Sequence, residues 1–202
     1  VRCTTVSCAT DAMSNATADL PRLFSLISAG TTQLLKAGAP QGALVALGYC
    51  FGGSMVLELA RHPRVDASAN VQYVAVSSVH GVLAPLGSGA ASGEVTARVQ
   101  VHHGELDYQG DDALAQLKAE LKAAVNGTDG LWEAIEYAKC EHGWTEPDLP
   151  VYKPRAAMQV HKSTFEFFEM AIGRVVPEAD PYQRLPICQS GPSPPTPLSG
   201  ED

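Results

Sequence analysis

The spacing of apolar residues along this chain alternates between a helical and a strand-like period. Leu, Phe and Ile recur at near-helical spacing over residues 19–38 and predict an amphipathic helix, which Gly38 can close. The short apolar run 43–47 predicts a strand. Apolar positions within residues 55–60 then return to the spacing of one helix face.

Strand-like and helical patterns continue to alternate further along the chain. This alternation favours a parallel sheet, because consecutive parallel strands need a long crossover connection, which is usually a helix. We therefore predict an α/β fold with a mostly parallel sheet and helices on both of its faces. The later strands are expected at 73–76, 95–102 and 131–138, and the later helices at 111–125 and 156–172. The apolar positions of the last helix that are expected to pack on the sheet are Met158, Phe165, Phe168 and Ile172.

Two segments outside this pattern flank the expected α/β domain at residues 19–173. Residues 1–18 are rich in Thr, Ser and Ala, show no convincing strand, and are expected to be irregular. Residues 174–202 form a Pro-rich tail, which is expected to be disordered from about residue 189 because its Pro/Ser-rich composition cannot build a core. A chain of 202 residues is long enough for one domain with a substantial core.

The junction between the 43–47 strand and the following helix reads G-Y-C-F-G-G over residues 48–53. A sharp strand-to-helix turn through small residues is the setting of a nucleophile elbow, here with cysteine in the place of serine. Such a turn strains the residue at its tip, Cys50, and places it at a helix N-terminus, which favours the thiolate. The amide of Phe51 would then donate to a developing oxyanion. The hexapeptide alone also fits a phosphate loop, a plain tight connection or a small buried cysteine.

Two later strands lead into residues that can complete a catalytic triad. Asp107 follows the 95–102 strand, and His142 follows the 131–138 strand. The chain order of nucleophile, acid and base is that of the α/β-hydrolases. Each separation leaves room for a strand–helix unit, so Cys50, Asp107 and His142 can meet at one edge of a parallel sheet.

Three motifs together resemble those of the dienelactone hydrolases: residues 48–53, then H-H-G-E-L-D ending at Asp107, then H-G-W-T-E-P-D from His142, followed by Y-K-P-R-A-A. The resemblance covers roughly residues 19–173. It implies an α/β-hydrolase fold and a Cys-Asp-His triad, in which Cys50 matches the nucleophile. It also implies hydrolysis of a small ester or lactone, of the carboxymethylenebutenolidase type, through a thioester intermediate with His142 as general base and without any cofactor.

The chain departs from the family's pattern at its start. Only 49 residues precede Cys50, and they contain no strand pattern other than the one at 43–47, so the fold is expected to be N-terminally truncated. The loop that usually supplies the second oxyanion donor would be missing with those strands. This departure leaves an alternative function open, in which the chain is an inactive remnant that binds a partner through its exposed sheet edge.

Aromatic and imidazole side chains close to the triad in sequence are the expected walls of a substrate pocket, because ligand pockets favour aromatic walls. Tyr49 precedes the nucleophile, Trp144 follows the base by two residues, and His80 ends the strand at 73–76, at the expected pocket mouth. Ordinary core packing is the alternative role for each of them.

The cysteines also leave a redox function open. Thiol transfer by Cys50 with Cys140 would require their Cα atoms to approach within about 7 Å. None of the five cysteines shows the C-x-x-C spacing of a zinc site, and no metal site is expected.

The charge and hydropathy of the chain limit the kinds of partner that it is expected to bind. A net charge of −8 and the lack of a basic cluster argue against nucleic acid or an anionic membrane surface. No apolar run approaches the roughly 20 residues that span a bilayer, and no secretory signal is present at Val1. The expectation is a soluble, cytoplasmic protein that is monomeric or weakly self-associating and acts on a small-molecule ester or lactone.

Overall fold

The computed structural model describes residues 6–62, 73–92, 94–125 and 132–173, which contain one four-stranded parallel sheet. Each strand pairs with the next one in the chain, so the order across the sheet is β1-β2-β3-β4. The strands are β1 (Val45–Tyr49), β2 (Ala75–Val79), β3 (Arg98–Leu106) and β4 (Trp132–Glu141). Because all four run in the same direction, their carboxyl ends meet at one edge of the sheet.

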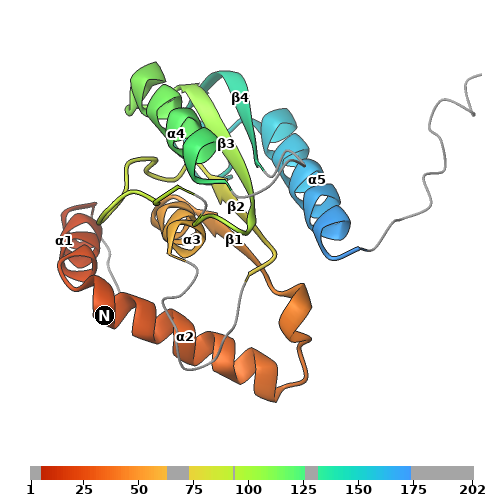
Figure 1. The fold of residues 1–202 in the computed structure, drawn as a ribbon. Helices are drawn as coiled ribbons and strands as arrows, with labels where there is room; N and C mark the ends of the chain where they lie inside the picture. Colours follow the sequence, from red (N-terminus) through yellow and green to blue (C-terminus); the bar gives the residue numbers. More distant parts are fainter. Residues whose placement is uncertain (1–5, 63–72, 93, 126–131, 174–202) are drawn as a thin grey trace, which may run out of the picture.

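Helices cover both faces of this sheet. α3 and α4 pack on one face and α5 packs on the other, and Figure 1 shows α4 and α5 on opposite sides of the strands. The prediction of an α/β fold is confirmed. The helices are α1 (Val6–Thr17), α2 (Leu20–Lys36), the short 3₁₀ helix η1 (Gln41–Ala43), α3 (Phe51–Arg61), α4 (Gly110–Ala124) and α5 (Pro154–Ala171).

The core follows from the alternation of side chains along β3. Val99 and Val101 face the α3 and α4 side, where they join the main cluster of buried aliphatic side chains. Gln100 and His102 face the other side, where both side chains hydrogen-bond to residues of α5 or β4. One strand therefore holds an apolar layer on one face and a buried polar layer on the other.

Residues 6–17 are helical, so the expectation of an irregular segment over residues 1–18 is wrong for this part of it. The segment combines Ala and Met with small polar residues and contains neither Gly nor Pro, which makes a helix accessible to it. The described part of the segment contains no strand, as predicted. Residues 1–5 and the expected Pro-rich tail, 174–202, lie outside the described residues.

The packing face of α5 also differs from the prediction. Met158 and Phe165 were expected to pack on the sheet, but they are 70% and 62% exposed. The buried stripe runs instead through Val160, Thr164 and Phe168, at helical spacing. Phe168 was assigned correctly, whereas the polar Thr164 is buried because it hydrogen-bonds within the polar layer under β2 and β3.

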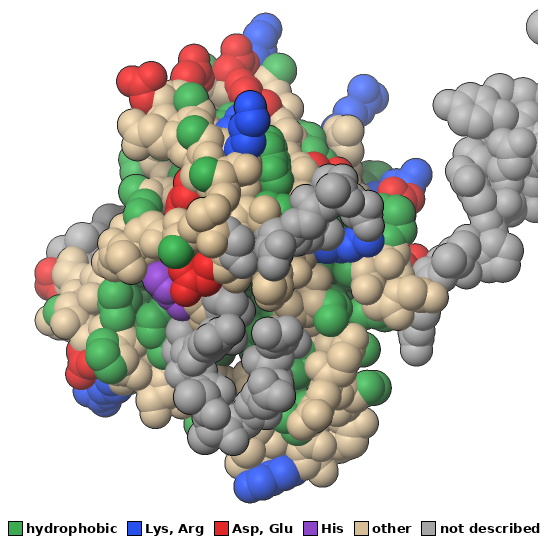
Figure 2. Space-filling model, viewed as in Figure 1, with side chains coloured by type: hydrophobic (Ala, Val, Ile, Leu, Met, Phe, Trp, Pro, Cys, Tyr) green, Lys and Arg blue, Asp and Glu red, His purple; other side chains and the backbone are tan. Residues whose placement is uncertain are grey.

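The helices α1 and α2 lie apart from the sheet in Figure 1, α1 at the left of the view and α2 along its lower part. Figure 2 shows hydrophobic side chains on the surface of this region, and Leu26 and Leu34 of α2 are largely exposed. Within the described residues, β1 pairs with β2 alone and forms one edge of the sheet. This edge is the feature on which the binding-module alternative depends.

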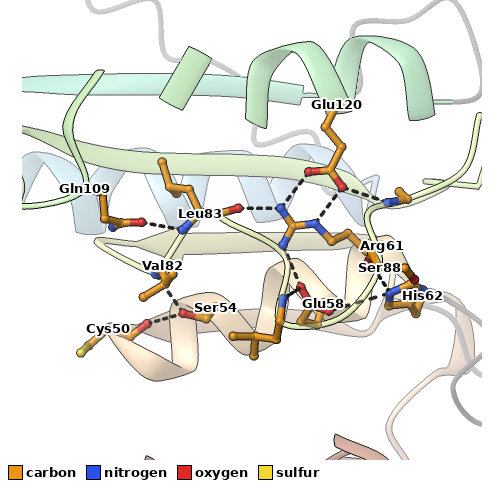
Figure 3. Close-up of polar contacts among 12 residues, drawn as sticks. Cys50, Ser54, Glu58, Arg61, His62, Val82, Leu83, Ser88, Gln109 and Glu120 are labelled. Carbon is orange, nitrogen blue, oxygen red and sulfur yellow. Dashed lines mark hydrogen bonds and ion pairs between the residues drawn. The ribbon is translucent and has the colours of Figure 1, made fainter. Parts of the chain in front are cut away.

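A buried ion-pair network joins α3 to α4 (Figure 3). Arg61 donates to Glu58 at 2.8 Å on its own helix and to both carboxylate oxygens of Glu120, at 2.8 and 2.9 Å, on α4. It also donates to the carbonyl of Leu83 in the loop after β2. The helix α3, which follows Cys50, is therefore fixed at its far end by charged groups as well as by apolar packing.

Candidate active site

The strand-to-helix turn has the strained geometry that its sequence predicts. Cys50 adopts φ 50° and ψ −119° between β1 and α3, in a region that costs a non-glycine residue roughly 1–3 kcal/mol. A Cβ at Gly48 would overlap the carbonyl of Gly52, and one at Gly53 would lie 2.8 Å from the Cα of Gly81. The glycines are therefore required by close backbone approach on both sides of the elbow.

Cys50, His142 and Asp107 converge at the carboxyl edge of the sheet. His142 Nε2 lies 3.3 Å from the sulfur of Cys50, and its Nδ1–H donates to Asp107 Oδ2 at 2.9 Å. The three residues come from the turn after β1, the loop after β3 and the loop after β4. The bond to the carboxylate fixes the imidazole so that Nε2 faces the sulfur.

The hydrogen bonds that link Asp107, His142 and Cys50 shift the pKa values of all three side chains. The hydrogen bond with His142 lowers the pKa of the Cys50 thiol, assisted by the N–H of Phe51. The hydrogen bonds with Asp107 and Cys50 raise the pKa of His142 to about 9. Burial alone would raise the pKa of Asp107, but the hydrogen bonds from His142 and Gln109 outweigh it and keep that pKa low. These directions favour a thiolate–imidazolium pair beside a charged carboxylate.

Gln109 holds Asp107 in place. Its backbone and side-chain N–H groups both donate to Asp107 Oδ1, at 3.3 and 3.2 Å. Its side chain also bridges the loop after β2, donating to the carbonyl of Gly81 and accepting from the N–H of Leu83. Sequence analysis did not single out Gln109, although its position two residues after the acid was an available signal.

His80 is buried, so its side chain is not exposed at a pocket mouth as expected. Its Nδ1 accepts from the backbone N–H of Cys50 at 3.2 Å, so the ring proton lies on Nε2 and is donated to Thr145 Oγ1 at 2.8 Å. Burial lowers the pKa of His80 to about 4, so the ring is neutral beside His142. His80 therefore supports the backbone of Cys50 from the interior.

Trp144 takes the alternative role, which is core packing. It is 0% exposed and packs on Tyr137 and His80. Tyr49 is partly exposed next to the nucleophile, with its hydroxyl 3.4 Å from His161 Nδ1. Of the three residues expected to line a pocket, only Tyr49 is partly exposed.

Tyr108 is a site residue that sequence analysis missed. Its ring centroid lies 5.0 Å from that of His142, and the residue is 70% exposed. Partial desolvation of its hydroxyl by the neighbouring side chains raises the pKa of that group, and the charges of Asp107 and Cys50 raise it further. The ring therefore flanks the triad on its solvent side.

We expect substitution of His80 to lower kcat by more than the accompanying loss of folding stability can explain. His80→Phe removes both hydrogen bonds, whereas His80→Asn keeps an acceptor near the Nδ1 position and tolerates the left-handed backbone, φ 41°. Misplacement of a nucleophile costs up to roughly 100-fold, so kcat should fall about 10- to 100-fold in His80→Phe and less in His80→Asn. Ester kinetics and urea unfolding of both variants check this. A fall in kcat that merely tracks lost stability would contradict the supporting role.

The described residues contain no cluster of three or more His, Cys, Asp or Glu side chains that could hold a metal ion. None of the described helices is long and apolar enough to cross a membrane. Cys50 and Cys140 are both free; Cys50 is exposed, whereas Cys140 is buried with Tyr137 and Trp144. The redox pairing of these two cysteines gains no support from this arrangement.

Comparison with known proteins agrees with the fold and the motifs. The family model described as "Dienelactone hydrolase family" matches residues 7–172. None of the curated proteins resembles the chain closely enough to count as a match.

Solved structures with a similar fold include hydrolases from bacteria and from a metagenome. A Klebsiella pneumoniae subsp. pneumoniae MGH 78578 protein assigned as a dienelactone hydrolase has a TM-score of 0.54 and 18% identity, covering 75% of this chain and 59% of its own. The α/β-hydrolase enzyme MGS-M1 from a Medee basin deep-sea metagenome library has a TM-score of 0.54 and 14% identity, covering 78% of this chain and 64% of its own. The carboxylesterase Cest-2923 from Lactobacillus plantarum WCFS1 has a TM-score of 0.54 and 14% identity, covering 76% of this chain and 68% of its own.

The chain thus spans 59% and 64% of the length of the first two of these structures. At such low identity the likeness shows the fold alone, which is the α/β-hydrolase fold. The family match covers most of the chain and includes all three motifs. This chain therefore belongs to the dienelactone hydrolase family and has an α/β-hydrolase fold.

Proposed function

We propose that this chain is a cysteine hydrolase that cleaves small esters or lactones. The observation that carries the proposal is the continuous hydrogen-bond chain from Asp107 through His142 to the sulfur of Cys50, at a strained elbow. Membership of the dienelactone hydrolase family and the esterases among the similar folds support the same reaction class. No cofactor is needed for it.

In the proposed mechanism the Cys50 thiolate attacks the ester carbonyl, and a tetrahedral oxyanion forms. The N–H of Phe51, at the N-terminus of α3, is the proposed donor to that oxyanion. His142 Nε2–H then protonates the departing alkoxide, which leaves a thioester on Cys50 and a neutral imidazole. Water attacks the thioester while His142 Nε2 takes its proton, and loss of the acid restores the thiolate–imidazolium pair. Proton transfer of this kind is typically worth about 10²–10⁴-fold.

The pH dependence should report this ion pair. Because the pKa of Cys50 is lowered and that of His142 is raised to about 9, kcat/KM should rise as the thiolate forms and fall as His142 loses its proton near pH 9. Asp107→Asn removes the carboxylate that raises the pKa of His142, so the basic limb should move to lower pH. Initial rates from about pH 5 to 10 check both limbs. A basic limb that stays in place in Asp107→Asn would contradict the assignment.

Steady-state hydrolysis of p-nitrophenyl acetate tests the proposed function. The chain should release many equivalents of p-nitrophenol per site, and prior alkylation with iodoacetamide should stop the release. A single equivalent without further turnover would overturn the hydrolase proposal, since it would show a reactive thiol that cannot complete the cycle.

The alternative is a binding module that uses the open edge of β1. The unpaired edge within the described residues and the partly exposed Leu47 favour it, because such an edge can accept a strand from another chain. Lack of turnover combined with concentration-dependent self-association or capture of an added strand peptide would favour this alternative. Sustained turnover by a monomer or weakly associating species favours the hydrolase.

A further inference from the structure

The two loops that carry Asp107 and His142 are acidic and apolar. Residues 105–109 read E-L-D-Y-Q and residues 141–149 read E-H-G-W-T-E-P-D-L, with no Lys or Arg in either loop. Both loops also expose large apolar side chains: Leu106, Tyr108 and Leu149. The rim of the site therefore presents negatively charged and apolar side chains to a bound substrate.

Glu146 occupies a fixed position on this rim. Its neighbour Thr145 is buried and accepts the hydrogen bond from His80, which in turn accepts the N–H of Cys50. The turn is closed by Glu146 N–H to the carbonyl of Gly143 at 3.0 Å, directly after His142. Glu146 itself is exposed, so its carboxylate stands on the solvent side of a turn that is tied to the nucleophile.

The charge of Glu146 acts at the sulfur. The hydrogen bond with His142 lowers the pKa of the Cys50 thiol, while the Glu146 carboxylate acts in the opposite direction. Burial raises the pKa of Tyr49, and the same carboxylate adds to that increase. Among the described residues, His142 is the only cationic group that acts on the sulfur. No lysine or arginine is among the groups that shift the pKa of the Cys50 thiol, so a substrate carboxylate near the sulfur would meet the charge of Glu146.

We propose that Glu146 is a specificity-determining residue, which disfavours esters and lactones that carry a free carboxylate and favours uncharged substrates with apolar groups. The inference rests on the proposed hydrolase function and narrows it. Tyr108, beside His142, and Leu149, whose Cδ1 lies against Gly143, supply the apolar contact. A carboxymethylene butenolide carries a carboxylate and belongs to the disfavoured class.

Paired neutral and anionic reagents test this inference. The esters are p-nitrophenyl acetate and mono-p-nitrophenyl succinate, and the alkylating agents for Cys50 are iodoacetamide and iodoacetate. Removal of one nearby charge should raise the anionic-to-neutral ratio about three- to tenfold in Glu146→Gln, for kcat/KM and for alkylation alike, and less at high salt. Each ratio cancels any change in the reactivity of the thiolate itself. Asp148→Asn, an equal charge change on the same exposed turn, is the matched control and should leave both ratios unchanged.

The alkylation ratio keeps the inference separate from the hydrolase proposal. A raised iodoacetate-to-iodoacetamide ratio in Glu146→Gln without ester turnover in the parent would support the charge effect and overturn the hydrolase proposal. Equal ratios in the parent, Glu146→Gln and Asp148→Asn would overturn the inference, whether or not the esters are hydrolysed.

Discussion

The Cys50→Ala variant is expected to hydrolyse p-nitrophenyl acetate at least about 10⁴-fold more slowly than the parent, because loss of a triad nucleophile leaves only binding and oxyanion stabilisation. Cys50→Ser should also lose most activity, since the pair with His142 lowers the pKa of a thiol, whereas a serine hydroxyl starts from a far higher pKa. Steady-state kinetics with matched protein concentrations measure both losses.

Cys140→Ala is the matched control for this prediction. Cys140 lies two residues before His142, but it is buried in the apolar cluster with Tyr137 and Trp144. Its removal should cost stability through a small cavity and should not remove turnover. Comparable activity in the parent and Cys50→Ala would disprove the nucleophile assignment, and equal losses in Cys50→Ala and Cys140→Ala would favour a paired-thiol function.

The second large effect is expected on stability. Arg61→Met should reduce the free energy of unfolding by about 3–5 kcal/mol, because removing one member of a buried ion network leaves its partners uncompensated. Glu58, on the same helix, is buried and would lose its cationic partner, and the carbonyl of Leu83 would lose its donor (Figure 3). Urea unfolding gives the difference, provided that the slope of the transition is unchanged.

The control for Arg61→Met is a substitution in an ion pair on the surface. Lys162 lies 3.7 Å from Glu166 on the exposed face of α5, and Lys162→Met should change stability by less than about 1 kcal/mol. Similar small losses in Arg61→Met and Lys162→Met would show that the buried network is not a major source of stability.

The Arg61 network also reaches the active site. Leu83 accepts from Arg61 through its carbonyl and donates through its N–H to Gln109, which holds Asp107 (Figure 3 shows the first two links). The loop after β2 therefore contacts both the ion-pair network at the far end of α3 and the side chain that holds Asp107.

The convergence of Cys50, Asp107 and His142 could be predicted because the ends of the strands can be recognised in the sequence. Parallel strands place their carboxyl ends at one edge, so the residues that follow three apolar runs had to lie close together. The elbow was readable for a related reason: only glycine fits where the backbone of residues 48–53 approaches itself and the loop at Gly81.

The roles of His80 and Trp144 could not be read from the sequence. Both flank the triad, and nearness in sequence does not separate a residue that faces the substrate from one that faces the interior. His80 turns inward because its backbone is left-handed, φ 41°, and its two ring nitrogens find partners on different loops. Thr164 of α5 is a similar case, because its burial depends on hydrogen bonds to β2 and β3 that no periodicity reveals.

The most direct test of the central claim is rapid acid quenching during p-nitrophenyl acetate turnover, followed by peptide mapping by mass spectrometry. The account predicts an acetyl thioester on the peptide that contains Cys50, formed and lost at rates that match turnover, and accumulating in His142→Ala, which lacks the base for deacylation. Turnover without an acyl group on Cys50, or with the acyl group on another residue, would contradict it.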